Sequence, residues 1–247
     1  MSEPFILSAF IGVFGSIQLG MAAALTLFFA VLGCISRGVT LSGAAAGALI
    51  SFALYAGAGP GAFAVLVTVF AVTWLATRVG YRRKIALGTA ERRSGRSALQ
   101  VLANLAVAGA CAAAYGWFAP KPAFILAMSA ALCEAVADTV SSELGQVSSD
   151  TARLITNWSE VAAGTDGGIT WFGTVAGACS AALIAAACLA FGLIPPRGVL
   201  TAAVAGTIGM LADSYMGAWF ERSGKLNNDA VNFLGTVVAA ALAFLLA

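Results

Sequence analysis

Eight apolar stretches, each about long enough to cross a lipid bilayer, constrain this chain more than any other feature of its sequence. A helix needs about 20 apolar residues to cross the hydrocarbon core. Only 10% of the 247 residues are charged, whereas a soluble domain carries roughly 25%. We therefore expect an all-α protein, a polytopic transmembrane helical bundle of about seven or eight spans with short loops, forming a single integral membrane domain over residues 1–247. The spans are predicted at 17–36, 41–58, 61–80, 98–118, 122–144, 169–194, 198–220 and 229–247.

Two interpretations remain open for the residues before the first predicted span. The stretch "FILSAFIGVF", residues 5–14, is apolar but too short to cross a membrane alone. It either extends the first helix or lies at the membrane interface.

The basic residues predict how the bundle is oriented. Cytoplasmic loops carry an excess of lysine and arginine. Alternation of the eight spans assigns Lys121 and Arg197 to one side of the membrane and the other 11 basic residues to the opposite side. We therefore expect a protein of the cell inner membrane with both termini outside and its polar loops in the cytoplasm. The 11 residues are Arg37, Arg78, Arg82, Arg83, Lys84, Arg92, Arg93, Arg96, Arg153, Arg222 and Lys225.

Acidic residues lie inside the predicted membrane region. The stretch "EAVADTVSSELGQ" (134–146) holds Glu134, Asp138 and Glu143, and Asp213 lies in a second span. Burying one carboxylate at a helix centre in hydrocarbon costs about 2.5–3.5 kcal/mol. Glu134 and Asp138 are one helical turn apart, so they repel each other unless a cation lies between them. Oxygen-rich clusters suit Mg²⁺, and all four acids are predicted metal ligands. The alternative is that they pair with basic residues of other helices.

Polar residues also run into the fourth predicted span. Arg96, Gln100 and Asn104 recur at every fourth position and should share one helix face. Because lipid would penalise such a stripe, we expect it to face the acids. The glycine-rich "GTDGG" (164–168) precedes the sixth span and is predicted to present backbone N–H groups to an anion. It lacks the Gly-Lys-Ser/Thr of a Walker A loop. The chain also lacks histidine, which excludes imidazole bases.

Three similar segments indicate an internal repeat, and each begins a span that leaves the predicted cytoplasmic side. Thr40, Thr170 and Asn232 are the predicted N-caps. Because helix N-termini favour anions, these three parallel, repeat-like helix starts are predicted to hold phosphates near the acids. The alternative is chance similarity between Ala/Gly-rich helices. The segments are "GVTLSGAAAGA" (38–48), "GITWFGTVAGA" (168–178) and "AVNFLGTVVAA" (230–240).

The same segments carry small residues four positions apart. Gly43 and Gly47 form one such pair, Gly173 and Gly177 another, and Gly235 and Ala239 a third. Small residues at this spacing let helix backbones approach closely in membranes. We therefore predict that these glycines pack against neighbouring helices.

With these residues in view, the chain resembles the membrane protein family catalogued as domain of unknown function 92, which includes plant phytyl-phosphate kinase and animal transmembrane protein 19. The stretch "DTVSSELG" also resembles the acidic motif of CTP-dependent prenol kinases. The stretches that carry the family resemblance follow the family's order and span most of the chain. They are "LGTAERRSGRSALQVLAN" (87–104), "DTVSSELG" (138–145), "RLITNWSEVAAGTDGGITWFGT" (153–174), "LADSYMGA" (211–218) and "NNDAVNFLGT" (227–236).

The resemblance implies a kinase that transfers the γ-phosphoryl group of a nucleoside triphosphate to an isoprenyl or phytyl monophosphate, giving the diphosphate. CTP is the expected donor. The implied cofactor is Mg²⁺, and the expected partners are the nucleotide, the isoprenyl monophosphate and membrane lipids, with no nucleic acid. Candidate catalytic residues are Asp138, Glu143, Asp213 and Arg96. Candidate substrate- and phosphate-binding residues are Lys84, Gln100, Asn104, Ser142, Thr165, Asp166, Gly167, Gly168, Asn228 and Asn232.

A second function class uses the same intramembrane acids. An ion- or proton-coupled transporter or a lipid translocase would need them for coupling. Its polar residues should then continue to the outer face, yet the predicted outer loops, such as "APKP" (119–122), are poor in acids. This pattern favours the kinase.

Overall fold

The computed structural model describes residues 3–90 and 94–247, and side chains from residue 17 onward within these ranges. Two π-helical turns, η1 and η2, continue α5 and α8. The elements are α1 (Glu3–Ile35), α2 (Leu41–Ala58), α3 (Pro60–Arg78), α4 (Tyr81–Leu87), α5 (Ala98–Ala113), η1 (Ala114–Phe118), α6 (Pro122–Gly145), β1 (Arg153–Leu154), β2 (Gly168–Ile169), α7 (Trp171–Ala190), α8 (Pro196–Met216), η2 (Gly217–Glu221) and α9 (Asn228–Leu245).

The predicted transmembrane bundle is confirmed. Among the described residues, eight helices are long and apolar enough to cross a membrane, at Ile17–Ile35, Leu41–Ala58, Pro60–Arg78, Ala98–Phe118, Pro122–Gly145, Trp171–Ala190, Pro196–Glu221 and Asn228–Leu245. Residues 5–14 continue α1 and form no separate element.

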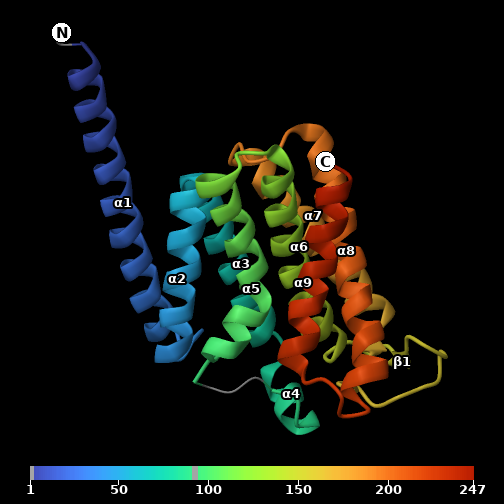
Figure 1. Ribbon diagram of the computed structural model, residues 1–247. Coiled ribbons are helices and arrows are strands. Elements are labelled where there is room, and N and C mark those ends of the chain that lie inside the picture. The colour runs from blue at the N-terminus through green and yellow to red at the C-terminus, as the bar shows by residue number, and fades with distance from the viewer. Residues whose placement is uncertain (1–2, 91–93) are drawn as a thin grey trace.

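The spans run alternately up and down, so both termini lie at one end of the bundle, and α4 and β1 lie at the other (Figure 1). The short strands β1 and β2 pair antiparallel, Arg153 with Ile169 and Leu154 with Gly168. Eleven basic residues were predicted to share one side of the membrane. Those of them that the structure describes lie in helix ends and loops at the α4–β1 end of the bundle. Arg92 and Arg93 of that set lie outside the described residues.

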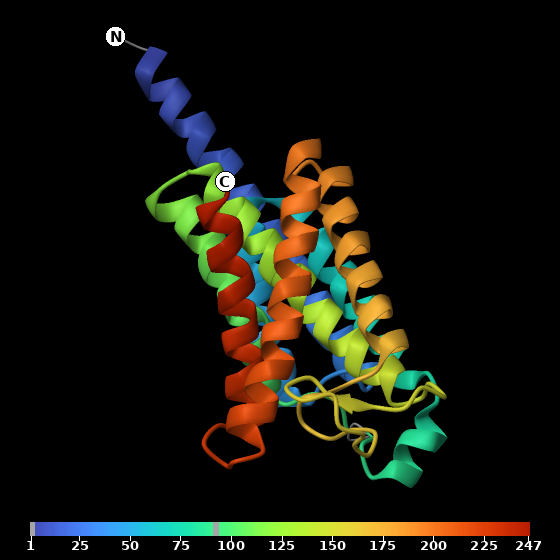
Figure 2. The same cartoon turned by 90° about the vertical axis from the view of Figure 1, so that its right-hand side faces the viewer.

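The α6 helix is the axis of the bundle. It packs against α3, α5, α7, α8 and α9, and Figure 2 shows it among these helices. Every residue from Ile125 to Ala137 is buried. Glu134 therefore faces other helices and avoids the hydrocarbon that would make it costly.

Glycines let the neighbouring helices approach α6 closely. A Cβ added to Gly173 would lie 2.6 Å from the carbonyl oxygen of Ser141, and one added to Gly177 would lie 2.8 Å from that of Ala137. These contacts confirm the predicted helix packing for α7. The prediction is wrong for Gly47, because no atom lies within 4 Å of a Cβ at that position. Gly47 faces a cavity.

The spanning helices from α2 onward begin differently at the two ends of the bundle. At the α4–β1 end, each first turn is capped by a side-chain oxygen that accepts a backbone N–H: Thr40 before α2, Ser97 before α5, Thr170 before α7 and Asn227 before α9. At the opposite end, α3, α6 and α8 begin with proline, whose missing N–H would have no helical partner there. Polar caps therefore gather at one end.

The N-cap prediction is confirmed for Thr40 and Thr170 and is wrong for Asn232. The α9 helix begins at Asn228, and Asn227 Oδ1 accepts a hydrogen bond of 2.9 Å from the backbone N–H of Ala230. Because a cap was available earlier in the sequence, Asn232 lies in the second turn of α9. Its side chain is thereby free to point sideways into the bundle.

Candidate functional site

A polar cavity of about 270 Å³ lies at the α4–β1 end of the bundle. Its wall is built from the first turns of α5, the last turns of α6, the 163–170 loop, the end of α8 with η2, and the start of α9. Thirteen of the residues predicted as site residues line it: Arg96, Gln100, Asn104, Asp138, Ser142, Glu143, Thr165, Asp166, Gly167, Gly168, Asp213, Asn228 and Asn232. Segments more than 100 residues apart in the sequence thus meet in one cavity.

Two carboxylates from different helices line this cavity. Asp138 projects from α6 and Asp213 from α8, and both line the wall. They are close enough to repel one another. Arg96 attracts Asp138 from the start of α5. The arrangement therefore combines excess negative charge with one positive group, as a site for a cation and an anion would.

Glu134 lies one turn deeper in α6 than Asp138. The residue is 1% exposed, and in the described part of the chain neither carboxylate oxygen has a hydrogen-bond partner. Both Asp138 and Asp213 repel it. A Cβ on Gly235 would lie 2.5 Å from Glu134 Oε1 and 3.3 Å from the Asp213 Cβ, so Glu134 and Asp213 are adjacent at that glycine. An unpartnered carboxylate at this depth is costly, and a bound cation would relieve the cost.

Arg96 is fixed by its backbone more than by its side chain. Its N–H donates to the carbonyl oxygen of Gly38, and its own carbonyl oxygen accepts from the N–H of Thr40, both at 3.0 Å. Gly95 adopts a φ of +85° and touches the backbone of Gly38 and Val39, an approach that only glycine permits. The guanidinium extends from this anchor and donates from Nη2 to Thr139 Oγ1 at 3.2 Å.

The predicted stripe of α5 faces the acids. Gln100 closes a capping box with Ser97 at the start of the helix. Asn104 follows one turn later, is buried, and donates from Nδ2 to the carbonyl oxygen of Gln100 at 2.8 Å. Both residues line the cavity that holds Asp138.

On α9, Asn232 contacts the acid of α8. With its amide nitrogen turned toward α8, Asn232 donates to Asp213 Oδ2 at 3.2 Å and to the carbonyl oxygen of Asn228 at 3.1 Å. Asn232 therefore lines the cavity as predicted. It does so as a hydrogen-bond donor to a carboxylate and not as the N-cap of a helix.

The glycine-rich loop 164–168 packs directly on η2. Gly167 has a φ of +73°, and a Cβ there would lie 2.6 Å from the backbone nitrogen of Ala218. This close contact brings Asp166 near Glu221, and the two acids repel each other. Internal bonds of the loop use the N–H groups of Thr165 and Gly168.

The start of α7 is less open to an anion than predicted. Asp150 Oδ2 accepts from the N–H of Phe172 at 2.8 Å, and Thr170 Oγ1 accepts from the N–H of Gly173 at 3.0 Å. The start of α2, capped by Thr40, contacts Arg96 and does not line the polar cavity. The three helix starts lie at one end of the bundle, but only those of α7 and α9 contribute residues to the polar cavity.

Lys84 and Glu143, predicted separately as a phosphate ligand and a metal ligand, form a salt bridge with each other. Lys84 Nζ lies 2.5 Å from Glu143 Oε2, and the lysine side chain is 0% exposed. The same ammonium group donates to the carbonyl oxygens of Ala76 and Thr77 at the end of α3. Three acceptors thus hold Lys84 outside the polar cavity, while Glu143 still lines it.

The sequence reasoning missed several polar residues of this wall. Glu221 is eight positions after Asp213, so the two share a helix face, and that spacing was a usable signal. Glu221 and Asp138 also repel each other. The remaining missed polar residues are Thr89, Thr139, Ser141, Gln146 and Ser214.

The donor set fits Mg²⁺ in a particular way. Within the described residues, no group of three or more Asp, Glu, Cys or His side chains is arranged to hold a metal ion, so the four predicted ligands do not form a preassembled cage. Mg²⁺ usually takes one or two carboxylates and completes its shell with water and substrate phosphates. The pair Asp138 and Asp213, with the unpartnered Glu134 one turn deeper in α6, matches that requirement.

Comparison with known proteins assigns the family. The model of the family described as integral membrane protein DUF92 matches residues 24–240. The chain belongs to this family. It is 40% identical over 185 residues to the uncharacterized membrane protein MJ0933 of Methanocaldococcus jannaschii, covering 74% of each chain. It is 33% identical to the chloroplastic protein VTE6 of Arabidopsis thaliana, covering 88% of this chain and 70% of that protein.

A third relative is the uncharacterized membrane protein sll0875 of Synechocystis. The two proteins are 31% identical over 195 residues, which is 77% of this chain and 75% of the relative. No solved structure matches the chain. The matched region of the family, residues 24–240, includes every residue of the polar cavity.

Proposed function

We propose that this protein is a membrane kinase that transfers the γ-phosphoryl group of a nucleoside triphosphate, with CTP as the donor, to an isoprenyl monophosphate. The observation that carries the proposal is the polar cavity, which is lined by Arg96, Asp138 and Asp213. There Arg96 attracts Asp138, and Asp213 on α8 repels Asp138. A cavity at one end of the bundle could bind both the head group of a membrane lipid and a nucleotide that enters from the aqueous phase. With the basic loops in the cytoplasm, the cavity opens to the cytoplasmic side.

In the proposed reaction, an oxygen of the lipid monophosphate attacks the γ-phosphorus of the nucleotide. A P–O bond to the lipid phosphate forms, the bond from the γ-phosphorus to the β,γ-bridging oxygen breaks, and the nucleoside diphosphate leaves with that electron pair. The attacking phosphate is already ionised and needs no strong base, which suits a chain without histidine. Catalysis then depends on positioning and on stabilising charge.

The cavity offers suitable groups for both tasks. The guanidinium of Arg96 matches the geometry of phosphate oxygens, and its anchored backbone would hold it in place. Asp138 and Asp213 would hold Mg²⁺, with Glu134 adding negative charge behind them. When bound, Mg²⁺ neutralises charge on the phosphates. Asn232 would orient Asp213 through their hydrogen bond.

The restriction of polar side chains to one half of α6 favours the kinase over a transporter. From Ile125 to Cys133 this helix is buried and apolar except for Ser129, whose hydroxyl donates to the carbonyl oxygen of Ile125. The acids start only at Glu134. A coupled transporter needs polar groups that continue across the membrane. The α6 helix carries its acids only in the half that is nearer the α4–β1 end.

The test is a screen of the purified protein in nanodiscs. CTP, ATP, GTP and UTP are each combined with geranyl, farnesyl, geranylgeranyl and phytyl monophosphate, and the diphosphate is detected by mass spectrometry. We expect diphosphate with CTP, and a loss of about 100-fold or more for Asp138→Asn. Glu160→Gln is the matched control, because Glu160 is exposed and pairs with Arg153 outside the cavity.

Two outcomes would contradict the proposal. One is the absence of diphosphate for every pair of substrates. The other is an Asp138→Asn variant that keeps near-normal transfer. Transport of ions or lipid phosphates by the purified protein in nucleotide-free liposomes would instead support the transporter.

A further inference from the structure

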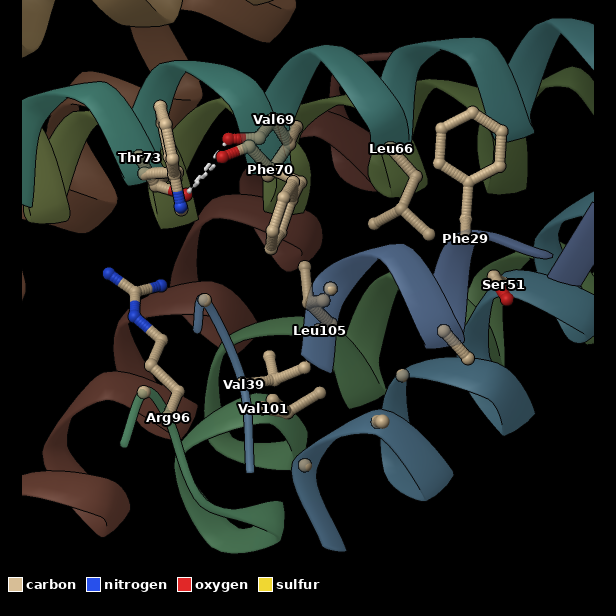
Figure 3. A pocket seen from close by; sticks show the side chains of 18 of the residues that line it. Phe29, Val39, Ser51, Leu66, Val69, Phe70, Thr73, Arg96, Val101 and Leu105 are labelled. Atoms are coloured by element: carbon tan, nitrogen blue, oxygen red, sulfur yellow. Dashed lines mark hydrogen bonds between the residues drawn. The ribbon is translucent and has the colours of Figure 1, made fainter. Parts of the chain in front are cut away.

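A second, apolar cavity lies beside the polar one. It has a volume of about 500 Å³, within the range of roughly 300–1,000 Å³ that is usual for ligand sites. Helices α1, α2, α3 and α5 form its walls, with apolar side chains that include Phe29, Leu66, Phe70, Val101 and Leu105. Figure 3 shows these side chains around the cavity, with Arg96 at one end and Phe29 and Ser51 at the other.

The two cavities share part of their walls. Arg96 and Asn104 line both the apolar cavity and the polar one. Both belong to the α5 region, and Arg96 Nη2 donates to Thr139 on α6. A molecule in the apolar cavity would therefore end beside the carboxylates of the polar cavity.

Positive charge is confined to one end of the apolar cavity. Arg37, Arg78 and Arg96 line it there. Arg78 is held by a hydrogen bond of 2.8 Å from Nη2 to the carbonyl oxygen of Ser36, and its guanidinium lies 3.7 Å from the centre of the Trp74 ring. Acidic residues are missing from the described wall. This charge distribution complements a molecule with an anionic head and a long apolar body.

The body of the cavity follows α2 away from Arg96. Gly43 packs on the carbonyl group of Arg96, whereas Gly47 and Ser51 line the wall one and two turns further on. Eight residues of helix cover about 12 Å. At the far end, Phe29 packs edge-to-face on Phe63, with ring centres 5.3 Å apart, and the two rings line the cavity there.

We propose that this apolar cavity holds the isoprenyl chain of the lipid monophosphate, with the phosphate at Arg96 and the chain end at Phe29. The inference rests on the proposed function and adds to it the site that selects the length of the chain. Gly47 leaves the middle of the cavity open, and Phe29 limits its depth.

The first experiment locates the chain without requiring turnover. The full-length protein in nanodiscs is irradiated with geranylgeranyl monophosphate that carries a diazirine at the far end of its chain, and labelled peptides are identified by mass spectrometry. No nucleotide is added. We expect labels on α1 and α3 near Phe29 and Phe63, and a tenfold excess of phosphatidic acid, a two-chain anionic lipid, should leave them in place. Labels on α7 or α8, no labels, or displacement by phosphatidic acid would overturn the inference.

The second experiment changes the size of the cavity. Gly47→Phe puts a ring into open space, so the ratio of geranylgeranyl to geranyl monophosphate turnover should fall at least tenfold. Phe29→Ala should raise that ratio. Gly20→Phe is the matched control, because Gly20 also lies within a spanning helix and has no atom within 4 Å of a Cβ, but lies outside the cavity.

The two experiments separate the two proposals. Labels near Phe29 in a protein that makes no diphosphate with any nucleotide would reject the kinase and keep the chain site. Diphosphate formation with an unchanged ratio in Gly47→Phe would keep the kinase and reject the chain site.

Discussion

Arg96 donates a hydrogen bond to Thr139, the residue that follows Asp138 on the central helix, at 3.2 Å. The bond joins the start of α5 to the acid-bearing part of α6. It also fixes a guanidinium on the boundary between a polar and an apolar cavity. Phosphate recognition at this boundary is the common element of both proposals.

Replacing Arg96 with lysine should weaken binding of the lipid monophosphate. Lysine keeps the charge but loses the planar fork that contacts two phosphate oxygens. We expect the KM for the lipid to rise about tenfold, equivalent to roughly 1.4 kcal/mol, with a smaller change in the KM for CTP. Steady-state kinetics with each substrate varied would measure both. Arg153→Lys, at an exposed pair with Glu160, serves as the control, and equal changes in both KM values would argue against a lipid-specific role.

Mg²⁺ should stabilise the folded protein through Asp138 and Asp213. A ligand that binds only the native state raises its stability, by about 2.7 kcal/mol at 100 times its dissociation constant. We expect 10-fold steps in Mg²⁺ concentration to raise the melting temperature of the wild type stepwise, and to have little effect on Asp213→Asn. Differential scanning fluorimetry without substrates would measure this. An equal Mg²⁺ response in Asp213→Asn and wild type would exclude Asp213 as a ligand.

Gly167→Ala should reduce activity without unfolding the bundle. The new methyl group would meet the backbone of Ala218 and push the 164–168 loop off η2. A displacement of about 1 Å in an active site can cost about 100-fold in rate. Gly192→Ala is a close control: Gly192 also has a positive φ, of +74°, but no atom lies within 4 Å of its Cβ position. If both variants lose activity equally, backbone strain and not the contact with Ala218 is responsible.

Lys84→Met should destabilise the protein by leaving Glu143 without its partner. Removing one member of a buried ion pair costs about 3–5 kcal/mol. The double variant Lys84→Met/Glu143→Gln removes both charges and should recover much of the loss. Thermal unfolding in detergent measures all four members of the cycle. Additive effects of the two substitutions would contradict a direct coupling between the side chains.

Much of the fold could be predicted from the sequence because the bilayer imposes a simple length rule. Hydropathy located all eight spans, and the caps Thr40 and Thr170 followed from local chemistry. Asn232 was misplaced because Asn227 offers an equally good cap one turn earlier. Local propensity does not decide between two caps when both lie next to apolar residues.

The site itself was only partly predictable. Residues such as Asp138 and Asn104 stand out because polar groups in membrane spans are expensive. The pair of Lys84 and Glu143 depends on α4 folding back under α3, a tertiary contact that no spacing in the sequence indicates. Gly47 looked like a packing residue because its spacing from Gly43 is typical of helix contacts, but the cavity beside it is a property of four helices together.

The enclosure of α6 also constrains how the chain is made. Synthesis runs from the N-terminus, so α6 leaves the ribosome before α7, α8 and α9, the helices that cover much of its surface. Until those helices arrive, Glu134 and Asp138 lack their final surroundings, although the apolar half of α6 favours entry into the bilayer. Nascent chains that stop before α9 should therefore be recognised by membrane quality control, because the last helix completes the shelter around the acids.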